Sequence, residues 1–393
     1  MGNLLPPPVF SSANNAPNLV LVTETWPPEI NGVAMTLSHL TDGLRSRDWR
    51  VSIVRPRQRG ETQAKSDDLL TPGLPIPGYA GLRFGLPVTA RLRAQWLRQR
   101  PAIVHIATEG PLGWAALKAA QSLAIPVTST FHTNFHRYCA HYKLAWLRGM
   151  VTRHLRHFHN RTAFTMVPND MLRHTLQQEG YRNVVVLGRG VDTRLFSPLR
   201  RSPALRRQWN VGEHDPVVIY VGRLAPEKNL GTLAAAFEQI EQRNPDARMV
   251  WVGEGPELEK LRRRYPHHVF AGSRIGDDLA QHYASADIFL FPSLTETFGN
   301  VIPEAMASGL AVVAYDYAAA ALYVKHQQNG LLAAFGDRDS FIRRAMALAE
   351  QPQQIRQFGR NACAAVAQHS WDAVCSQFEH YLDVAQRGTR DAA

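Results

Sequence analysis

Short apolar runs recur along this chain, and segments with helical spacing of apolar positions separate them. The runs lie at residues 18–22, 51–54 and 103–106, and again at 217–221, 248–252, 269–271, 288–291 and 311–314; residues 127–131 read as a further strand. The clearest helical segments lie at residues 33–45, 112–123 and 341–349. An unbroken run of four or five apolar residues is typical of a parallel strand buried on both faces. Strands that alternate with helices predict an α/β fold with two facing, doubly wound parallel sheets.

The length of the chain also favours two domains. Its 393 residues exceed the ~250–300 at which single cores stop growing. A Pro- and Arg-rich stretch separates the two series of strands and reads as a linker. We expect a flexible arm at 1–17, an N-terminal domain at 18–197, the linker at 198–216, a C-terminal domain at 217–369, and at 370–393 a helix that packs back on the N-terminal domain.

Composition excludes several classes of protein. A content of 45% hydrophobic residues is too high for a disordered chain. Three scattered cysteines, Cys139, Cys363 and Cys375, fit neither a disulfide framework nor a zinc site and indicate a reducing compartment. No apolar run reaches the ~18 residues of a membrane span, and the first residues lack the charged start of a signal peptide. We therefore expect a cytoplasmic protein, either soluble or attached to a membrane surface.

Residues 292–314 carry the strongest chemical signal. They follow a strand, turn through Thr295 to Gly299, and enter a helix near Asn300. Amides at a helix start can bind an anion such as a pyrophosphate. Glu296 and Glu304 lie eight residues apart, and carboxylates are acceptors suited to sugar hydroxyls. Two glutamates at this spacing are usually a cap and a solvated side chain, but here the Gly, the strand–turn–helix context and further loops on the same sheet edge favour a ligand site.

Three more loops follow strands. Arg223 and Lys228 are cations that can neutralise a diphosphate, although a pair of surface cations is the plain alternative. The loop at 272–275, with Arg274 and Ile275, is placed to meet a nucleobase. Gly32 follows the first strand, where the backbone can approach a phosphate closely, although a lone glycine more often marks a turn.

These residues resemble the donor-binding signature of the retaining glycosyltransferases of family 4, which have the GT-B fold. The E-x7-E element formed by Glu296 and Glu304, followed by A-M-A-S-G, carries the resemblance. The strings H-I-A-T-E-G-P-L-G (105–113), F-H-T-N-F-H-R-Y (131–138) and V-A-Y-D-Y-A-A-A (313–320) are similar to bacterial GDP-mannose-dependent α-mannosyltransferases that act on lipids. Related enzymes that use UDP-sugars share several of these strings.

The resemblance implies roles for particular residues. Catalysis would involve His132, Glu296, Arg223 and Lys228, with His132 stabilising the oxocarbenium-like transition state. The donor would be held by Gly32, Arg223, Lys228, Arg274, Ile275, Glu296, Phe298, Gly299, Asn300, Val301 and Glu304. Retention would proceed by front-face attack, without a protein nucleophile. Arg223, Lys228 and the helix amides would take the place of a metal, so neither a metal nor any other cofactor is expected.

Charge is unevenly distributed along the chain. Residues 1–200 hold 24 Lys and Arg against 11 acids, a net +13, and the remaining residues hold 20 against 22, a net −2. Sixty residues between Glu109 and Asp170 contain no acid. Apolar and basic positions at 141–158 alternate with helical spacing, and residues 91–98 are similar. A basic amphipathic helix is typical of docking to an anionic membrane surface, although an ordinary packed helix with a basic face is the alternative.

We therefore expect an enzyme that moves a hexose, most simply mannose from GDP-mannose, onto a membrane lipid at the inner face of the cytoplasmic membrane. A UDP-hexose transferase that makes glycosyl-diacylglycerol is the first alternative. A basic nucleic-acid-binding protein is a distant second, suggested by a pI of about 9.9. It would leave the two glutamates unexplained, so no nucleic-acid partner is expected.

Overall fold

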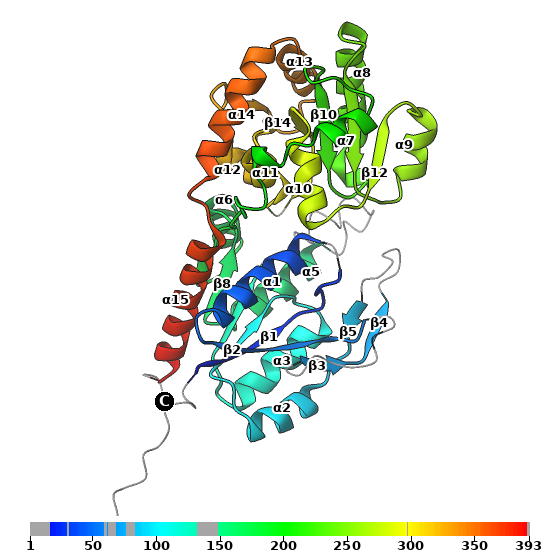
Figure 1. Ribbon diagram of the computed structural model, residues 1–393. Coiled ribbons are helices and arrows are strands. Elements are labelled where there is room, and N and C mark those ends of the chain that lie inside the picture. The colour runs from blue at the N-terminus through cyan, green and yellow to red at the C-terminus, as the bar shows by residue number, and fades with distance from the viewer. Residues whose placement is uncertain are drawn as a thin grey trace, which may run out of the picture.

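Two parallel sheets, one in each half of the chain, form the framework of the computed structural model (Figure 1). The structure describes residues 16–29, 31–58, 61, 68–75, 83–131, 148–296 and 298–390. Each expected apolar run that falls in these residues is a strand. The expected α/β class with two doubly wound sheets is confirmed.

The N-terminal sheet has the order β3-β2-β1-β6-β7-β8-β9, and its strands are parallel. Its strands are β1 (Asn18–Val22), β2 (Arg50–Pro56), β3 (Asp68–Thr71), β6 (Ile103–Ile106), β7 (Val127–Thr130), β8 (Phe164–Val167) and β9 (Val184–Val186). A small antiparallel pair, β4 (Gly73–Pro75) and β5 (Arg83–Gly85), forms a separate two-stranded sheet that contacts β2.

Helices cover both faces of this sheet: α1 (Gly32–Arg45), α2 (Thr89–Arg98), α3 (Pro111–Ser122), α5 (Arg148–His159) and α6 (Asp170–Gln178). The first of them starts where Asn31 accepts hydrogen bonds from the amides of Val33 and Ala34, which satisfies two amides that lack intrahelical partners. α2 packs on α3, and rings of α5 contact Trp114 of α3. These three helices therefore share one layer.

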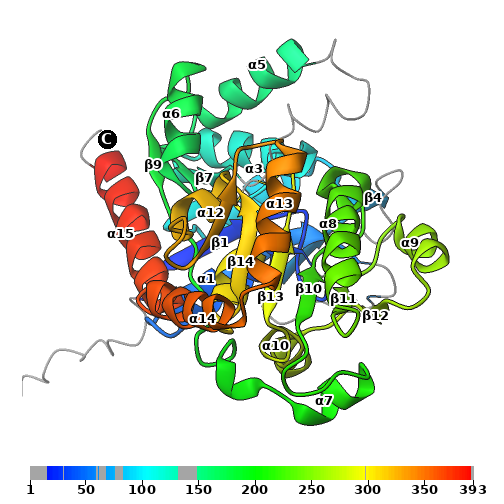
Figure 2. The ribbon, with the colours of Figure 1, turned by 90° about the horizontal axis from the view of Figure 1, so that it is seen from above.

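The C-terminal sheet has the order β12-β11-β10-β13-β14-β15 and is also parallel. Its strands are β10 (Val217–Val221), β11 (Arg248–Val252), β12 (Val269–Gly272), β13 (Ile288–Phe291), β14 (Ala311–Tyr315) and β15 (Gly330–Ala333). Its helices are α8 (Leu230–Arg243), α9 (Leu258–Arg264), α10 (Gly276–Ala284), α11 (Val301–Ala307), α12 (Ala318–Tyr323), α13 (Arg338–Ala349) and α14 (Pro352–Val366). α8 and α13 pack together (Figure 2), as do α11 and α14.

The connection at 198–216, expected as a linker, is folded against the C-terminal core. It contains η3 (Pro198–Arg200) and α7 (Pro203–Gln208), and Trp209 and Val211 are buried with the core residues. The buried Arg206 lies 3.2 Å from Asp287 and donates to backbone carbonyls of the same stretch. A charge this deeply buried needs such partners, and they hold the connection in place.

The last helix, α15 (Trp371–Arg390), returns along the N-terminal sheet (Figure 1). Phe378 and Leu382 are buried with Leu37 and Leu40 of α1 in one apolar cluster. Arg47, which follows α1, pairs with Asp372 at 2.5 Å. The chain passes between the two domains near Val191 and again near His369, and there the Val191 amide donates to the His369 carbonyl at 2.9 Å.

Each sheet reverses its strand order at one point. In the C-terminal sheet this point lies between β10 and β13, and in the N-terminal sheet between β1 and β6. Ligands of open parallel sheets bind beyond the carboxyl ends of the strands at such a reversal. A ligand site is therefore expected at the loops after these four strands.

Candidate active site

Lys228 and Glu296 meet at the reversal point of the C-terminal sheet. Lys228 ends the short helix η4 (Pro226–Lys228) after β10, and Glu296 lies in the loop after β13. The ammonium pairs with the Glu296 carboxylate, which also accepts a hydrogen bond from the Ser293 hydroxyl at 2.8 Å. Each of the paired side chains is 15% exposed, so solvent screens the pair only in part. The structure thus brings two of the expected residues together from distant parts of the sequence.

The loops after β10 and β11 pack backbone against backbone beside this pair. The Gly222 amide donates to Val252, and the Leu224 amide donates to Glu254. A Cβ on Gly253, whose φ is +137°, would overlap the carbonyl oxygen of Gly222. Only glycine fits such an approach, so the two loops form one rigid base under the site.

Arg223 lies on the same loop as Lys228 but is less buried. Its side chain is 39% exposed and lies 3.9 Å from the Glu227 carboxylate. The Tyr220 hydroxyl donates to the Arg223 carbonyl at 3.1 Å, which fixes the main chain there. Both expected cations therefore stand on one loop at the edge of the sheet.

Glu304 lies in the first turn of α11 and is half-buried. Its carboxylate accepts a hydrogen bond from the Tyr283 hydroxyl at 3.1 Å. Burial raises the pKa of Glu304 to about 7, and the bond from Tyr283 opposes this rise. The proton on this carboxylate therefore leaves near neutral pH.

Asn300 and Gly32 join the two domains at the site. The Asn300 side chain, just before α11, lies 3.5 Å from the Gly32 carbonyl at the start of α1. These two residues were expected at the donor from opposite ends of the sequence. The structure places them in contact.

The loop between Glu296 and α11 contains residues that are expected at the donor, and one of them has a buried side chain. Phe298 is only 5% exposed and packs on the ring of Tyr323, so its side chain belongs to the core. Because the apolar ring is stabilised by burial there, a contact of Phe298 with the donor stays a prediction, and it would involve the main chain of this residue. Gly299 adopts φ +94°, which favours glycine, and Val301 begins α11.

Arg274 and Ile275 lie at the start of α10, beyond β12. The Arg274 guanidinium donates to the Asp278 carboxylate at 2.9 Å and to the Ala271 carbonyl at 2.8 Å. The Ile275 side chain is 63% exposed. These two residues are thus two strands away from Lys228 along the sheet edge. His132 lies outside the described residues.

Sequence reasoning missed Glu24, which follows β1 at the reversal point of the N-terminal sheet. Its carboxylate accepts hydrogen bonds from the amides of Gly85 and of Leu112, in the first turn of α3. Burial raises the pKa of Glu24 to about 7, the two amide bonds lower it, and nearby Glu109 raises it. Glu24 therefore caps a helix, as an acid at a helix start does.

Glu109 follows β6 and points into the domain. Its buried carboxylate lies 3.1 Å from Nε2 of His159, the last residue of α5. The other ring nitrogen of His159 lies 2.9 Å from the Ser129 hydroxyl on β7. A buried carboxylate needs such partners, and this chain of contacts ties α5 to the sheet.

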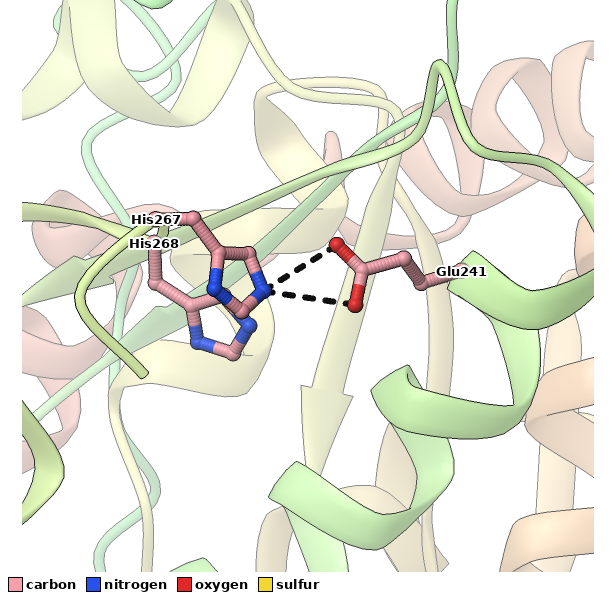
Figure 3. Close-up of side chains that lie close together, drawn as sticks. All are labelled: Glu241, His267 and His268. Carbon is pink, nitrogen blue, oxygen red and sulfur yellow. Dashed lines mark hydrogen bonds and ion pairs between the residues drawn. The ribbon is translucent and has the colours of Figure 1, made fainter. Parts of the chain in front are cut away.

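Glu241, His267 and His268 form the one cluster of possible metal ligands among the described residues (Figure 3). His267 lies 3.2 Å from the Glu241 carboxylate. The Trp251 indole N–H donates to Nδ1 of His268 at 3.1 Å, so the neutral ring carries its proton on Nε2. A protonated nitrogen cannot ligate a metal, and this cluster does not fit one.

The expected amphipathic helix is described only as α5. Leu155 is buried and Val151 packs on the same apolar cluster, so this part of the apolar face packs inward. Met150 is 65% exposed, and His154 and His157 lie against Trp114. In the part of the chain that the structure describes, no helix combines the length and apolar character needed to cross a bilayer.

Family comparisons cover both halves of the chain. Residues 30–195 match the model described as Glycosyltransferase Family 4, and residues 215–351 match the one described as Glycosyl transferases group 1. Over 383 residues the chain is 31% identical to a GDP-mannose-dependent alpha-mannosyltransferase of Mycobacterium tuberculosis, spanning 95% of this chain and 99% of the relative. This chain belongs to glycosyltransferase family 4.

The chain is also similar to a lipid glycosyltransferase and to a solved structure. It is 23% identical to an alpha-monoglucosyldiacylglycerol synthase of Acholeplasma laidlawii, over 94% of this chain and 98% of that one. Its fold is similar to that of a sucrose-phosphate synthase from Thermosynechococcus elongatus, with a TM-score of 0.77 at 19% identity, over 96% of this chain and 100% of that one. This structural similarity confirms the expected GT-B fold, and the family models together with the Mycobacterium tuberculosis relative confirm the glycosyltransferase activity.

Proposed function

We propose that this family 4 enzyme transfers mannose from GDP-mannose, with retention, to a membrane lipid acceptor. The pairing of Lys228 with Glu296 at the reversal point of the C-terminal sheet carries the proposal. The similarity to the Mycobacterium tuberculosis mannosyltransferase, over nearly the full length of both chains, supports the choice of donor.

The donor would lie along the carboxyl edge of the C-terminal sheet. The base would lie at Arg274 and Ile275, and Glu304 would accept hydrogen bonds from the ribose. The diphosphate would lie at Arg223 and Lys228, near the amides of Asn300 and Val301 and the backbone of Gly32. The hexose would reach Glu296. The order of the strands supports this arrangement for the base, the diphosphate and the hexose, since the loops of Arg274, Lys228 and Glu296 follow β12, β10 and β13.

Catalysis in this arrangement is chiefly electrostatic. As the bond to the sugar breaks, negative charge grows on the leaving diphosphate, and Lys228 and Arg223 stabilise it. In the structure Lys228 is held by Glu296, so a bound diphosphate would compete with this carboxylate for the ammonium. We assign front-face attack, in which the leaving phosphate takes the acceptor proton, and His132 a role at the transferred sugar.

Exposed cations on the helical layer of the N-terminal sheet support docking to an anionic membrane. Arg93 on α2, Lys118 on α3 and Arg153 on α5 are exposed, and these helices share one layer. Each cation near an anionic leaflet contributes about 1 kcal/mol. Since the apolar side chains of α2 and α5 largely pack inward, we propose attraction by charge rather than insertion. Flotation with anionic and neutral liposomes tests this, and equal binding to both contradicts it.

A donor panel tests the reaction itself. The purified chain is incubated with membrane lipid extract and GDP-mannose, UDP-glucose, UDP-galactose or UDP-glucuronate, and products are identified by mass spectrometry. We expect a lipid that carries one added hexose from GDP-mannose and that an α-mannosidase can cleave. A product from a UDP-sugar alone would reject the proposed donor and favour the alternative, a glycosyl-diacylglycerol synthase, which the Acholeplasma laidlawii relative supports.

A further inference from the structure

The carboxyl edge of the C-terminal sheet continues past Glu296. Beyond β13 the next strands are β14 and β15. Tyr317 follows β14, and Phe335 follows β15. These residues therefore lie on the far side of Glu296 from Arg274, where the base is proposed to bind, and no role in the donor site uses them.

Phe335 is unusual for a phenylalanine because 49% of it is exposed. Its ring is nevertheless held in place. The ring centroid lies 4.9 Å from that of Tyr317 and 6.1 Å from that of Tyr315. Tyr315 is buried in the core, so the exposed ring rests on a rigid support.

Tyr317 links this aromatic pair to the catalytic loop. Its hydroxyl donates to the main-chain carbonyl of Glu296 at 2.7 Å. The following residue, Ala318, has φ +52°, a conformation that costs an alanine about 1–2 kcal/mol. Such strain persists only where the surroundings hold it in place, so the geometry between the rings and Glu296 is well defined.

We infer that Tyr317 and Phe335 form a subsite that binds a pyranose ring. A pyranose has faces of C–H groups and a rim of hydroxyls. Aromatic rings held in place bind such faces at low entropic cost, because the rings are already ordered. The inference rests on the proposed function as a sugar transfer, and it adds a binding surface beyond Glu296.

Two sources could supply the ring: the transferred hexose of the donor or a sugar of the acceptor. Steady-state kinetics of the Phe335→Ala variant separates them. A higher KM for the lipid acceptor, with the donor KM and donor hydrolysis without acceptor unchanged, assigns the ring to the acceptor. A change in donor KM and in hydrolysis assigns it to the donor. Either result supports the subsite.

Direct binding tests the subsite without reference to transfer. Saturation-transfer NMR of the full chain with methyl α-mannopyranoside, methyl α-glucopyranoside and methyl α-glucuronide reports contact with the sugar faces. We expect affinity for at least one glycoside to fall about three- to tenfold in Phe335→Ala and to persist in Phe335→Tyr. Leu199→Ala is the matched control, because it removes an apolar side chain that is 94% exposed in the connection between the domains.

Tyr317→Phe keeps the ring but removes the bond to Glu296. We expect kcat to fall while glycoside affinity stays unchanged, whereas Tyr265→Phe, which removes a tyrosine hydroxyl bonded to Glu238, changes neither. Equal glycoside binding and equal KM values in wild type and Phe335→Ala would overturn the subsite. If no donor supports transfer but glycosides still bind through Phe335, the proposed function fails and the subsite stands.

Discussion

Both sheets have a point at which the strand order reverses, but the charged side chains near the two points have different partners. In the C-terminal sheet, Lys228 and Glu296 meet in the open edge loops, and each remains 15% exposed. In the N-terminal sheet, Glu24 caps α3 and Glu109 is buried against His159. Glu24 and Glu109 therefore stabilise the N-terminal domain, whereas the Lys228–Glu296 pair stays at the edge of its sheet, where a ligand can reach it.

The largest expected effect is at the C-terminal reversal point. Lys228→Ala should lower kcat for hexose transfer about 10²- to 10³-fold, because it removes the charge facing the leaving diphosphate. Lys260→Ala is the matched control, since Lys260 on α9 is 71% exposed and pairs with Glu257, the residue just before that helix. A Lys228→Ala enzyme with wild-type kcat would show that the pair does not act in transfer.

At the N-terminal reversal point the expected effect is on stability. Glu109→Ala leaves His159 buried without its carboxylate, which should lower the free energy of unfolding by about 1–3 kcal/mol. GDP affinity should stay unchanged, because Glu109 faces the core. Urea unfolding and calorimetry measure the two quantities, with Asp42→Ala, an exposed acid on α1, as control. Lost GDP affinity at normal stability would contradict the contrast between the sheets.

The protonation of Glu304 should make donor binding at the C-terminal sheet depend on pH. Its pKa of about 7 lies above the ordinary 4.5, so between these two pH values the folded chain keeps a proton that the unfolded chain has lost. The free energy of unfolding therefore falls as the pH rises from 4.5 to about 7. The ionised form is the better acceptor for ribose hydroxyls. Affinity for GDP-mannose, whose diphosphate does not titrate here, should fall about fivefold from pH 8 to pH 6. Glu304→Gln should flatten this dependence, and an unchanged slope in calorimetry would exclude Glu304 as its source.

Two left-handed alanines give the smallest effect. Ala318 lies beside the candidate site with φ +52°, and Ala124 lies in the N-terminal domain between α3 and β7 with φ +49°. Ala→Gly at either position should raise the free energy of unfolding by about 0.5–1 kcal/mol, because relief of strain exceeds the added chain entropy. Thermal unfolding measures this. Only Ala318→Gly should lower kcat. Equal kcat values in the two variants would show that the backbone strain at Ala318 does not contribute to transfer.

Much of the fold could be predicted from the sequence, because buried parallel strands are apolar without interruption. The runs at 18–22, 103–106 and 217–221 coincide with β1, β6 and β10. The strands β3, β4, β5, β8, β9 and β15 were missed. Several of them mix polar with apolar residues, as in Asp68–Thr71 and Phe164–Val167, so they stand out less than the continuous apolar runs.

The candidate site was predictable in part. Glu296, Lys228 and Glu304 follow or flank strands in a recognisable motif, and the structure places them at one edge. The roles of Glu24 and Glu109 were not predictable, because their partners come from α3 and α5, far away in sequence. The apolar face of α5 was likewise ambiguous, since the same pattern suits a membrane or a protein core.

By itself, the sequence determined that this is a two-sheet α/β enzyme of glycosyltransferase family 4, with an acidic and basic pair available for a sugar diphosphate. Only the tertiary structure decided which charges stay at the edge and which are engaged inside. The reason is physical: a strand pattern records burial along the chain, whereas the partner of a charge is set by which loops the sheet order brings together. That order places Lys228 beside Glu296 and Phe335 beyond them, and the contact between the two domains brings Asn300 to Gly32.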